Sequence, residues 1–494
     1  MSAVSSYAKA LAVAAGRAVP IATRRHVYLS DRPLVFVPLA LAGEANAPLA
    51  AMIGTSPHDP YMLLVPQPRN RDLRFGFAAS LAEVVLAYVR SCTARFEVVG
   101  TDRLFLDAPQ LLVPNAAGLG FVKLLGRSTR FRRTNGPYPV PAGVPLLGRW
   151  LTHLGERSEH PGSSAMLAMT QTLSAHWASG QSAVEDANLA ALLGWIDPPE
   201  GVCGSEAALA AEDPLVWPPA GPSTDPAFDN EVLAPAIRAY QSATPDSPKR
   251  RRAVETLERE LRGQMEPTWR LMWHAIKVLR RLPAAETVET RWTADRRDFS
   301  RYHDYLSTDG RPQARRDGAV AAARRLQSLE REQTTFDAAR ALDDPLVMAS
   351  YRVTGEAFQG TVVSVDRNRR ILSERGRRVT RPKVVVGTGD PVHLPVGESL
   401  RAPQRIKQNA RITEIARSAD GVLVTLELDG GMGRAAVPAP GSVPEVGDEI
   451  TYTSVYPDAI RSPDLPPTDQ TPWTHGGPPR PYVPTDDDAR EAWE

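Results

Sequence analysis

The sequence predicts an α+β protein with several domains: an N-terminal α/β domain, a helical middle, a small C-terminal β-barrel and a disordered tail. Short apolar runs alternate with helical patterns at the start of the chain, and long amphipathic patterns fill the middle. Short β patterns follow residue 350. The chain has 494 residues, of which 42% are hydrophobic, enough for roughly two to four domains.

Four short apolar runs bounded by turn-forming residues predict buried strands in the N-terminal part. A helical pattern at 77–89 separates the second run from the third, and a further helix is expected near 117–125. Strands that alternate with helices predict an α/β domain at 26–135. The four runs occupy residues 34–39, 62–65, 96–99 and 111–113.

The middle of the chain carries helical patterns on both sides of a proline-rich linker. We expect a helical segment and this linker at 136–225, with 146–197 mostly helical, and a helical bundle or arm at 226–347. Ser247 and Pro248 can begin one helix, Pro267 a second, and a third should cover 313–342. The residues expected to be buried are Leu257, Leu261, Trp269, Ile276, Leu326 and Phe336.

The segment 348–460 predicts a small barrel of five short strands, at 358–365, 383–386, 410–416, 422–428 and 449–453. Its expected apolar core is Phe358, Val362, Val385, Ile412, Leu426 and Ile450. The strand order, the glycines that follow the fourth strand and the sequence PEVGD before the fifth resemble OB-fold and cold-shock-like barrels. That resemblance implies single-strand binding on one face, by charge and aromatic stacking.

Positive charge is concentrated in this barrel. Residues 351–420 contain 14 Lys or Arg and 7 Asp or Glu, whereas the whole chain carries a net charge of only +1. A local basic field indicates an anionic partner, and nucleic acid is the first candidate. The predicted nucleic-acid-binding residues are Arg367, Arg369, Arg370, Arg375, Arg377, Arg378, Arg381, Lys383, Arg405 and Lys407.

Aromatic side chains are scarce in the same segment. Its aromatic residues are Tyr351, Phe358, Tyr452 and Tyr456, and Phe358 is expected in the core. Contact with phosphates is therefore a better mechanism than base stacking. An acidic protein surface is a second possible partner, and a solvated arginine-rich loop without a partner is a third interpretation.

Signals for catalysis are weak, and we assign no catalytic residue. His153, Glu156 and His160 could share one helix face and offer nitrogen and oxygen ligands to a metal, with Glu159 nearby, but Pro161 ends that helix. Residues 115–123 form a glycine-containing turn from a strand into a helix, without the P-loop or dinucleotide pattern. No G-x-S-x-G elbow occurs. We predict no cofactor and no metal site.

Two cysteines, Cys92 and Cys203, provide no disulfide framework, so a cytoplasmic location is the simplest expectation. No run of about 18 apolar residues occurs, and we expect no membrane span. The segment 461–494 is acidic and rich in proline, which predicts a flexible tail. Abundant arginine and 45 prolines make the whole chain resemble proteins of high-GC actinobacterial genomes, a resemblance that implies no activity.

Three hypotheses for function remain open. The first is a non-enzymatic adaptor that binds nucleic acid on the barrel and works with a catalytic partner, such as a helicase-type ATPase. The second is a divergent hydrolase or nuclease with its active site in the N-terminal domain, which several convergent carboxylates in 26–135 would favour. The third is a scaffold for protein assembly, which would be favoured if the barrel arginines paired with the barrel's own acids.

Overall fold

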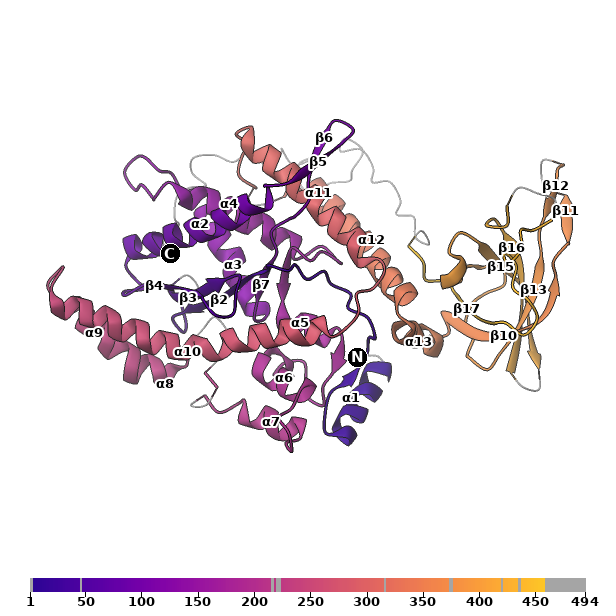
Figure 1. Cartoon of the computed structure of the whole chain (residues 1–494), viewed down its shortest axis with the longest axis horizontal. Coiled ribbons are helices and arrows are strands. Elements are labelled where there is room, and N and C mark those ends of the chain that lie inside the picture. Colours follow the sequence, from indigo (N-terminus) through magenta and orange to yellow (C-terminus); the bar gives the residue numbers. More distant parts are fainter. Residues whose placement is uncertain are drawn as a thin grey trace. The chain divides into compact units, whose positions relative to one another are not determined.

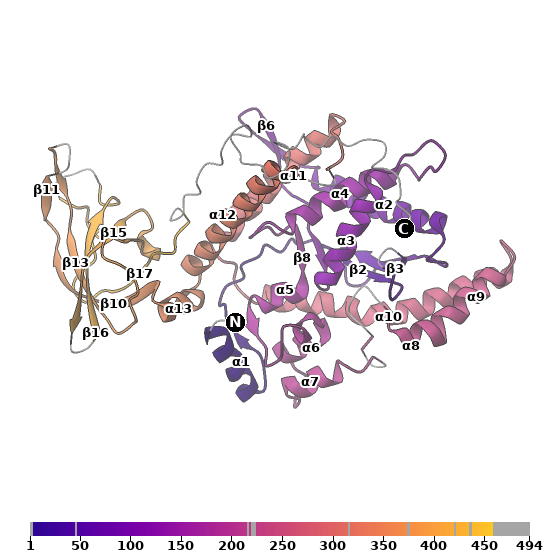
Figure 2. The same cartoon turned by 180° about the vertical axis from the view of Figure 1, so that it is seen from behind.

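The protein is a mixed α+β chain, and its computed structural model describes residues 3–44, 47–214, 217–218, 224–314, 317–372, 376–418, 421–433 and 437–457. The described residues form two compact units, shown in Figure 1 and Figure 2. The first comprises residues 3–21 and 25–329, and the second comprises Ala22–Arg24 and residues 330–457. The predicted tail at 461–494 lies outside the described residues.

A five-stranded mixed sheet forms the centre of the first unit, with strand order β4-β3-β2-β7-β8. Strands β2, β3 and β4 pair antiparallel, whereas β7 is parallel to both β2 and β8. The strands are β2 (Leu34–Ala40), β3 (Pro48–Gly54), β4 (Tyr61–Leu64), β7 (Leu111–Val113) and β8 (Met166–Ala168).

Helices cover both faces of this sheet, because both faces are apolar. Leu34 and Phe36 of β2 point into a core shared with α2, α3 and α4, while Val35 and Val37 point into a core shared with α5, α6 and α10. Successive side chains of a β-strand point to opposite faces of the sheet, so the two cores receive alternate residues of β2. Figure 1 shows α10 on one side of the strands and α2 on the other. These helices are α2 (Arg71–Cys92), α3 (Ala116–Thr129), α4 (Gly143–Arg157), α5 (Met169–Ser174), α6 (Leu189–Ile196) and α10 (Pro248–Arg280).

Further elements complete the first unit around this three-layer core. Two small antiparallel sheets pair β1 with β9 and β5 with β6. These elements are α1 (Ala3–Ala15), β1 (Val19–Pro20), β5 (Phe96–Val99), β6 (Asp102–Phe105), β9 (Trp177–Ala178), α7 (Gly204–Ala210), α8 (Pro226–Phe228), α9 (Ala234–Ser242) and α11 (Val288–Ser307). The division between the two units falls within α12 (Ala319–Asp343).

The structure corrects four expectations for the first half of the chain. The run at 96–99 forms strand β5, but this strand is exposed and pairs with β6 outside the central sheet. Strand β3 escaped prediction because three of its residues are alanine or proline, which are poor strand formers. The segment 146–197 is less helical than expected, since it contains β8 and β9. The sheet also extends beyond residues 26–135, because β8 supplies its fifth strand.

The expected break at Pro267 is absent, because α10 continues through this residue. Tertiary packing keeps the helix intact: Leu257 and Leu261 before the proline and Trp269 and Ile276 after it are all buried in one core. The expectation for α12 was wrong in part. Leu326 is 58% exposed, and Phe336 is half-buried.

Helix α2 is long and apolar enough to cross a membrane by length and composition alone. Eight of its residues are buried, and they belong to the core on one face of the sheet. The core helix of a soluble protein passes the same test of composition, so this helix is weak evidence for a membrane.

The second unit contains a six-stranded antiparallel sheet that is nearly closed into a barrel, with order β14-β15-β16-β13-β10-β17. Arg401, next to β14, exchanges two backbone hydrogen bonds of 2.9 Å with Thr453 of β17 and so joins the two ends of the sheet. The strands are β10 (Ala357–Asp366), β13 (Lys383–Thr388), β14 (Ser399–Leu400), β15 (Asn409–Ser418), β16 (Gly421–Asp429) and β17 (Glu449–Thr453).

The five predicted strands are confirmed as β10, β13, β15, β16 and β17, and β14 is an addition. OB-folds are five-stranded, so the sixth strand departs from that resemblance. The predicted core is confirmed except at one position. Val384 and Val386 of β13 point inward and are fully buried, which leaves Val385 on the outer side.

Helix α13 (Pro345–Thr354) precedes the barrel and is fixed at both ends. Asp344 is fully buried and accepts hydrogen bonds from the backbone of Thr23, Arg24 and Leu346 and from the Thr23 hydroxyl. Burial alone would raise the pKa of Asp344, but these hydrogen bonds lower it below its ordinary value. At its other end the helix stops at Gly355, whose φ of 77° suits glycine.

Candidate functional site

The predicted basic segment forms a two-stranded ribbon that extends from the barrel. Strands β11 (Arg370–Leu372) and β12 (Arg378–Thr380) pair antiparallel as a separate sheet, between β10 and β13 in sequence (Figure 1). The ribbon and the described residues that connect it to the barrel, 367–372 and 376–382, are called the arginine ribbon below. Most of the predicted binding residues belong to it.

Three of its arginines are half-buried and pair with carboxylates of the barrel. Arg367 lies 3.4 Å from Glu445, Arg369 lies 2.6 Å from Glu427, and Arg381 lies 2.9 Å from Asp429. The side chains of these arginines are between 24% and 35% exposed. Their charge is therefore balanced within the barrel.

Three other arginines of the ribbon are exposed, namely Arg370, Arg377 and Arg378. Arg370 donates a hydrogen bond to the Arg378 carbonyl across the ribbon, at 3.2 Å. Leu372, which stands opposite Arg378 in the strand register, is 70% exposed. The sequence alone could not separate these three exposed arginines from the half-buried ones, because the acids that pair with the half-buried arginines lie about 45 to 80 residues away in the chain.

The remaining predicted residues lie on the barrel or outside the described part. Lys383 is exposed and stands opposite Glu427 of β16 in the strand register. Arg405 donates a hydrogen bond to the Gly441 carbonyl, and Lys407 is exposed. Arg375 lies outside the described residues.

The aromatic side chains of the barrel provide no stacking platform among the described residues. Phe358 and Tyr452 are fully buried in its core, with ring centroids 6.0 Å apart. Tyr351 is half-buried on α13, and the ring of Tyr456 lies 5.1 Å from the guanidinium of Arg401.

The histidine and glutamate cluster of α4 separates into two environments. His153 is buried and stacks on Tyr302, with ring centroids 4.0 Å apart and planes 3° apart. Burial lowers the pKa of His153 to about 3. Glu156, Glu159 and His160 instead line a cavity. Among the described residues, no three His, Cys, Asp or Glu side chains are grouped to hold a metal ion.

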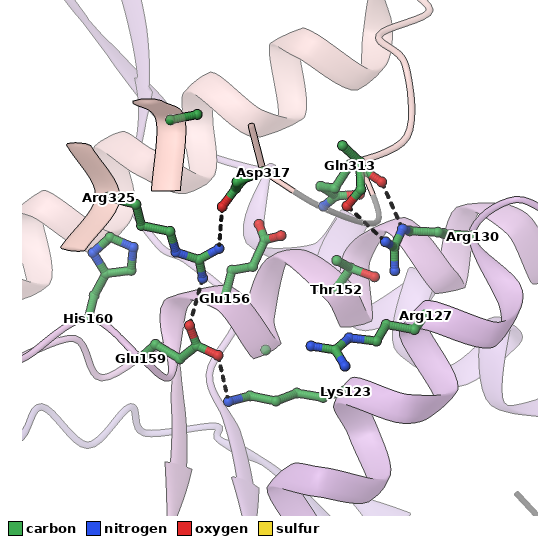
Figure 3. Close-up of a pocket in the computed structure, with 13 residues that line it drawn as sticks. Lys123, Arg127, Arg130, Thr152, Glu156, Glu159, His160, Gln313, Asp317 and Arg325 are labelled. Carbon is green, nitrogen blue, oxygen red and sulfur yellow. Dashed lines mark hydrogen bonds and ion pairs between the residues drawn. The ribbon is translucent and has the colours of Figure 1, made fainter. Parts of the chain in front are cut away.

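This cavity lies between α3, the end of α4 and residues 313–314 and 317–325, and has a volume of about 430 Å³ (Figure 3). We call it the charged cleft. Four cationic side chains and three carboxylates line it, together with His160, Gln313 and Thr152. The cations are Lys123, Arg127, Arg130 and Arg325, and the carboxylates are Glu156, Glu159 and Asp317.

Small residues bring the walls of the cleft together. A side chain at Gly126 would lie 2.8 Å from the Thr152 nitrogen, and one at Gly155 would lie 2.8 Å from Cγ of Lys123. Glycine at these points lets α3 and α4 pack closely and leaves longer polar side chains at the rim. Asn115 caps α3 through a 3.1 Å hydrogen bond from Gly118, so the turn at 115–123 mainly positions this helix.

Ion pairs occupy one side of the cleft. Glu159 contacts Lys123 at 3.1 Å and Arg325 at 2.6 Å, and Arg325 also lies 3.5 Å from Asp317. Burial alone would raise the pKa of Glu159, but the hydrogen bonds and charges of Lys123 and Arg325 lower it. Burial raises the pKa of Glu156. The nearby charges of Arg325 and Arg130 lower this pKa but offset only part of the increase.

Sequence reasoning identified Glu156, Glu159 and His160 but missed the cationic wall. Lys123, Arg127 and Arg130 follow one another at helical spacing, which is a signal that the sequence contains. Their meeting with Arg325 depends on a contact between segments about 200 residues apart in the chain, which no local pattern reveals.

Comparison with known proteins adds no family to this description. No protein-family model matches the sequence, and neither a curated protein nor a solved structure is significantly similar to it.

Proposed function

We propose that this protein binds nucleic acid through the arginine ribbon and acts as a non-enzymatic adaptor in the cytoplasm. One observation carries the proposal: Arg370, Arg377 and Arg378 are exposed together on a narrow two-stranded ribbon. A two-stranded ribbon fits the major groove of a duplex, and arginine suits contact with phosphates. A catalytic partner, such as a helicase-type ATPase, would supply the chemistry.

The mechanism we propose is electrostatic and independent of sequence. Each arginine that neutralises a phosphate releases counterions, so affinity should fall steeply as salt rises. The arginines paired with Glu427, Glu445 and Asp429 shape the base of the ribbon and contribute less to the field. The three exposed arginines would bind the phosphates.

A salt-series binding assay with single- and double-stranded DNA and RNA tests the proposal. Replacing Arg370, Arg377 and Arg378 together by alanine should weaken binding to all sequences alike. It should also reduce the log–log salt slope by about 0.7–0.9 for each phosphate that the variant no longer neutralises. A control with Arg90, Arg95 and Arg238 replaced by alanine removes the same charge from exposed positions of the first unit.

Comparison of the two variants distinguishes an effect of net charge on binding from a specific effect of the ribbon arginines. The proposal requires that the control bind as the parent does while the ribbon variant does not. Equally weakened binding in both variants, or no binding by the parent at low salt, would overturn it.

A scaffold for protein assembly is the second candidate. It is favoured by the pairing of Arg367, Arg369 and Arg381 with acids of the same barrel, which reduces the charge available to a polyanion. In that case the exposed arginines would contact an acidic protein surface. Failure to bind any nucleic acid at low salt would favour this candidate over the first.

A further inference from the structure

The charged cleft contains more positive charge than its own carboxylates balance. Lys123 and Arg127 of α3 and Arg130, the C-cap residue of this helix, lie four and three residues apart and all line the cleft. Like charges at these spacings destabilise a helix unless they are compensated. The dipole of α3 favours cations in its last turn. This dipole does not explain why the cations lie on the side of the helix that faces the cleft.

The three cations are compensated to different degrees. Lys123 pairs with Glu159 at 3.1 Å. Arg130 is only 4% exposed and donates to the backbone carbonyls of Gln313 and Ala314, at 2.8 and 3.0 Å. Arg127 forms no ion pair or hydrogen bond with the residues that the structure describes. Its exposed guanidinium lies at the edge of the cleft beside Lys123 (Figure 3).

Glu156 places a carboxyl group in the same cleft as these cations. Its half-buried carboxyl group projects into the cleft and accepts no hydrogen bond from the described residues (Figure 3). A carboxyl group in this position can exchange a hydrogen bond with a hydroxyl group of a ligand. The raised pKa of Glu156 also reduces its repulsion of a bound anion.

We propose that the charged cleft binds a small hydroxylated phosphate monoester, with the phosphate at Arg127 and Lys123 and a hydroxyl group at Glu156. The cavity of about 430 Å³ is within the usual range for small-molecule sites. Its lining is mostly charged, which suits a hydrophilic ligand. Arginine recognises phosphate through two parallel hydrogen bonds, and a lysine adds a point charge.

Isothermal titration of the full chain with three probes tests this site: glycerol 3-phosphate, inorganic phosphate and glycerol. Arg127→Ala should weaken binding of both phosphates by about tenfold, the equivalent of one ion pair of about 1.4 kcal/mol. Glu156→Ala should strengthen inorganic phosphate, because it removes a charge that repels the anion, and should favour glycerol 3-phosphate less, because it also removes the hydrogen-bond partner of the hydroxyl group. Arg90→Ala, in the last turn of α2, is the matched control and should change neither.

The ribbon variant with Arg370, Arg377 and Arg378 replaced by alanine separates this site from the proposed nucleic-acid interface. It should bind glycerol 3-phosphate as the parent does. Three results would overturn the inference: no binding of either phosphate at millimolar concentration, equal effects of Arg127→Ala and Arg90→Ala, or loss of phosphate binding in the ribbon variant. Equal effects of Glu156→Ala on the affinities for both phosphates would contradict the assigned contact between Glu156 and the hydroxyl group.

Discussion

Arg369 donates a hydrogen bond of 2.6 Å to Glu427, at the point where the arginine ribbon joins the barrel. Arg369 also donates to the Arg381 carbonyl at 3.0 Å, so a single guanidinium joins both sides of the ribbon to strand β16. Glu427 stands opposite both Lys383 and Arg411 in the strand register. One carboxylate therefore lies among three cations and reduces the field that any polyanion would meet.

The first prediction concerns this carboxylate. Glu427→Gln retains a hydrogen-bond acceptor for Arg369 but removes the negative charge, so affinity for nucleic acid should rise severalfold at low salt. The gain should shrink as salt screens it. Glu414→Gln, an exposed position of β15, is the control for a general change in net charge. Unchanged or weaker binding by Glu427→Gln would count against a nucleic-acid interface at the ribbon.

The second prediction compares two leucines of the helical middle. Leu261 is fully buried, whereas Leu326 is 58% exposed. Leu261→Ala should lower the free energy of unfolding by about 2–5 kcal/mol, and Leu326→Ala should change it by less than about 0.5 kcal/mol. Residues 330–457 contain no tryptophan, so tryptophan fluorescence during urea unfolding is free of signal from the barrel. A large decrease in stability for Leu326→Ala would show that this side chain is covered in solution.

The third prediction concerns the proline inside α10. Pro267 has no backbone N–H, so the carbonyl four residues earlier, that of the exposed Gly263, loses its helical donor. Pro267→Ala should raise the free energy of unfolding by about 1–3 kcal/mol. Pro248→Ala, at the first position of the same helix, restores no such bond and should change stability little. A destabilised Pro267→Ala variant would mean that packing depends on the proline.

The fourth prediction is a pH dependence that originates at His153. Its pKa is lowered to about 3 in the folded protein, first by burial and then by Arg157 and His160, whereas an unfolded histidine titrates near about 6.5. The unfolded chain therefore binds a proton that the folded chain does not. The free energy of unfolding should fall as pH decreases from about 6.5 toward 3, by at most about 1.4 kcal/mol per pH unit.

Urea unfolding at several pH values between about 6.5 and about 5, above the range in which most carboxylates titrate, isolates this contribution. His153→Phe keeps an aromatic ring against Tyr302 but cannot titrate, so its stability should vary less with pH. His58→Phe, at an exposed loop position, should retain the slope of the parent. The same slope in His153→Phe as in the parent would mean that His153 is protonated in the folded state.

Local patterns were sufficient for most of the barrel, because its strands are short, separated by turns and alternate between core and surface. The one misplaced core residue, Val385, belongs to a run of three valines in which the inward register is ambiguous from sequence. The long helices were also evident, but local rules placed a break at Pro267 that packing on both sides of the proline overrides.

The candidate sites were harder to predict because their chemistry depends on distant partners. The ten predicted cations formed one group in the sequence, and only the pairing of Arg367, Arg369 and Arg381 with acids far along the chain divides them. The charged cleft joins α3 and α4 to residues 313–314 and 317–325. Such a meeting of segments depends on how helices pack, which short-range periodicity does not encode.

The hydrogen bonds between Arg401 and Thr453 have a consequence for solubility. By joining β14 to β17, they leave the barrel without a free edge there that could recruit a strand from another molecule. The short strands β11 and β12, by contrast, pair only with each other among the described residues. Charged side chains on an open edge discourage such recruitment. The exposed arginines that we assign to binding would thus also protect the protein against aggregation through its ribbon.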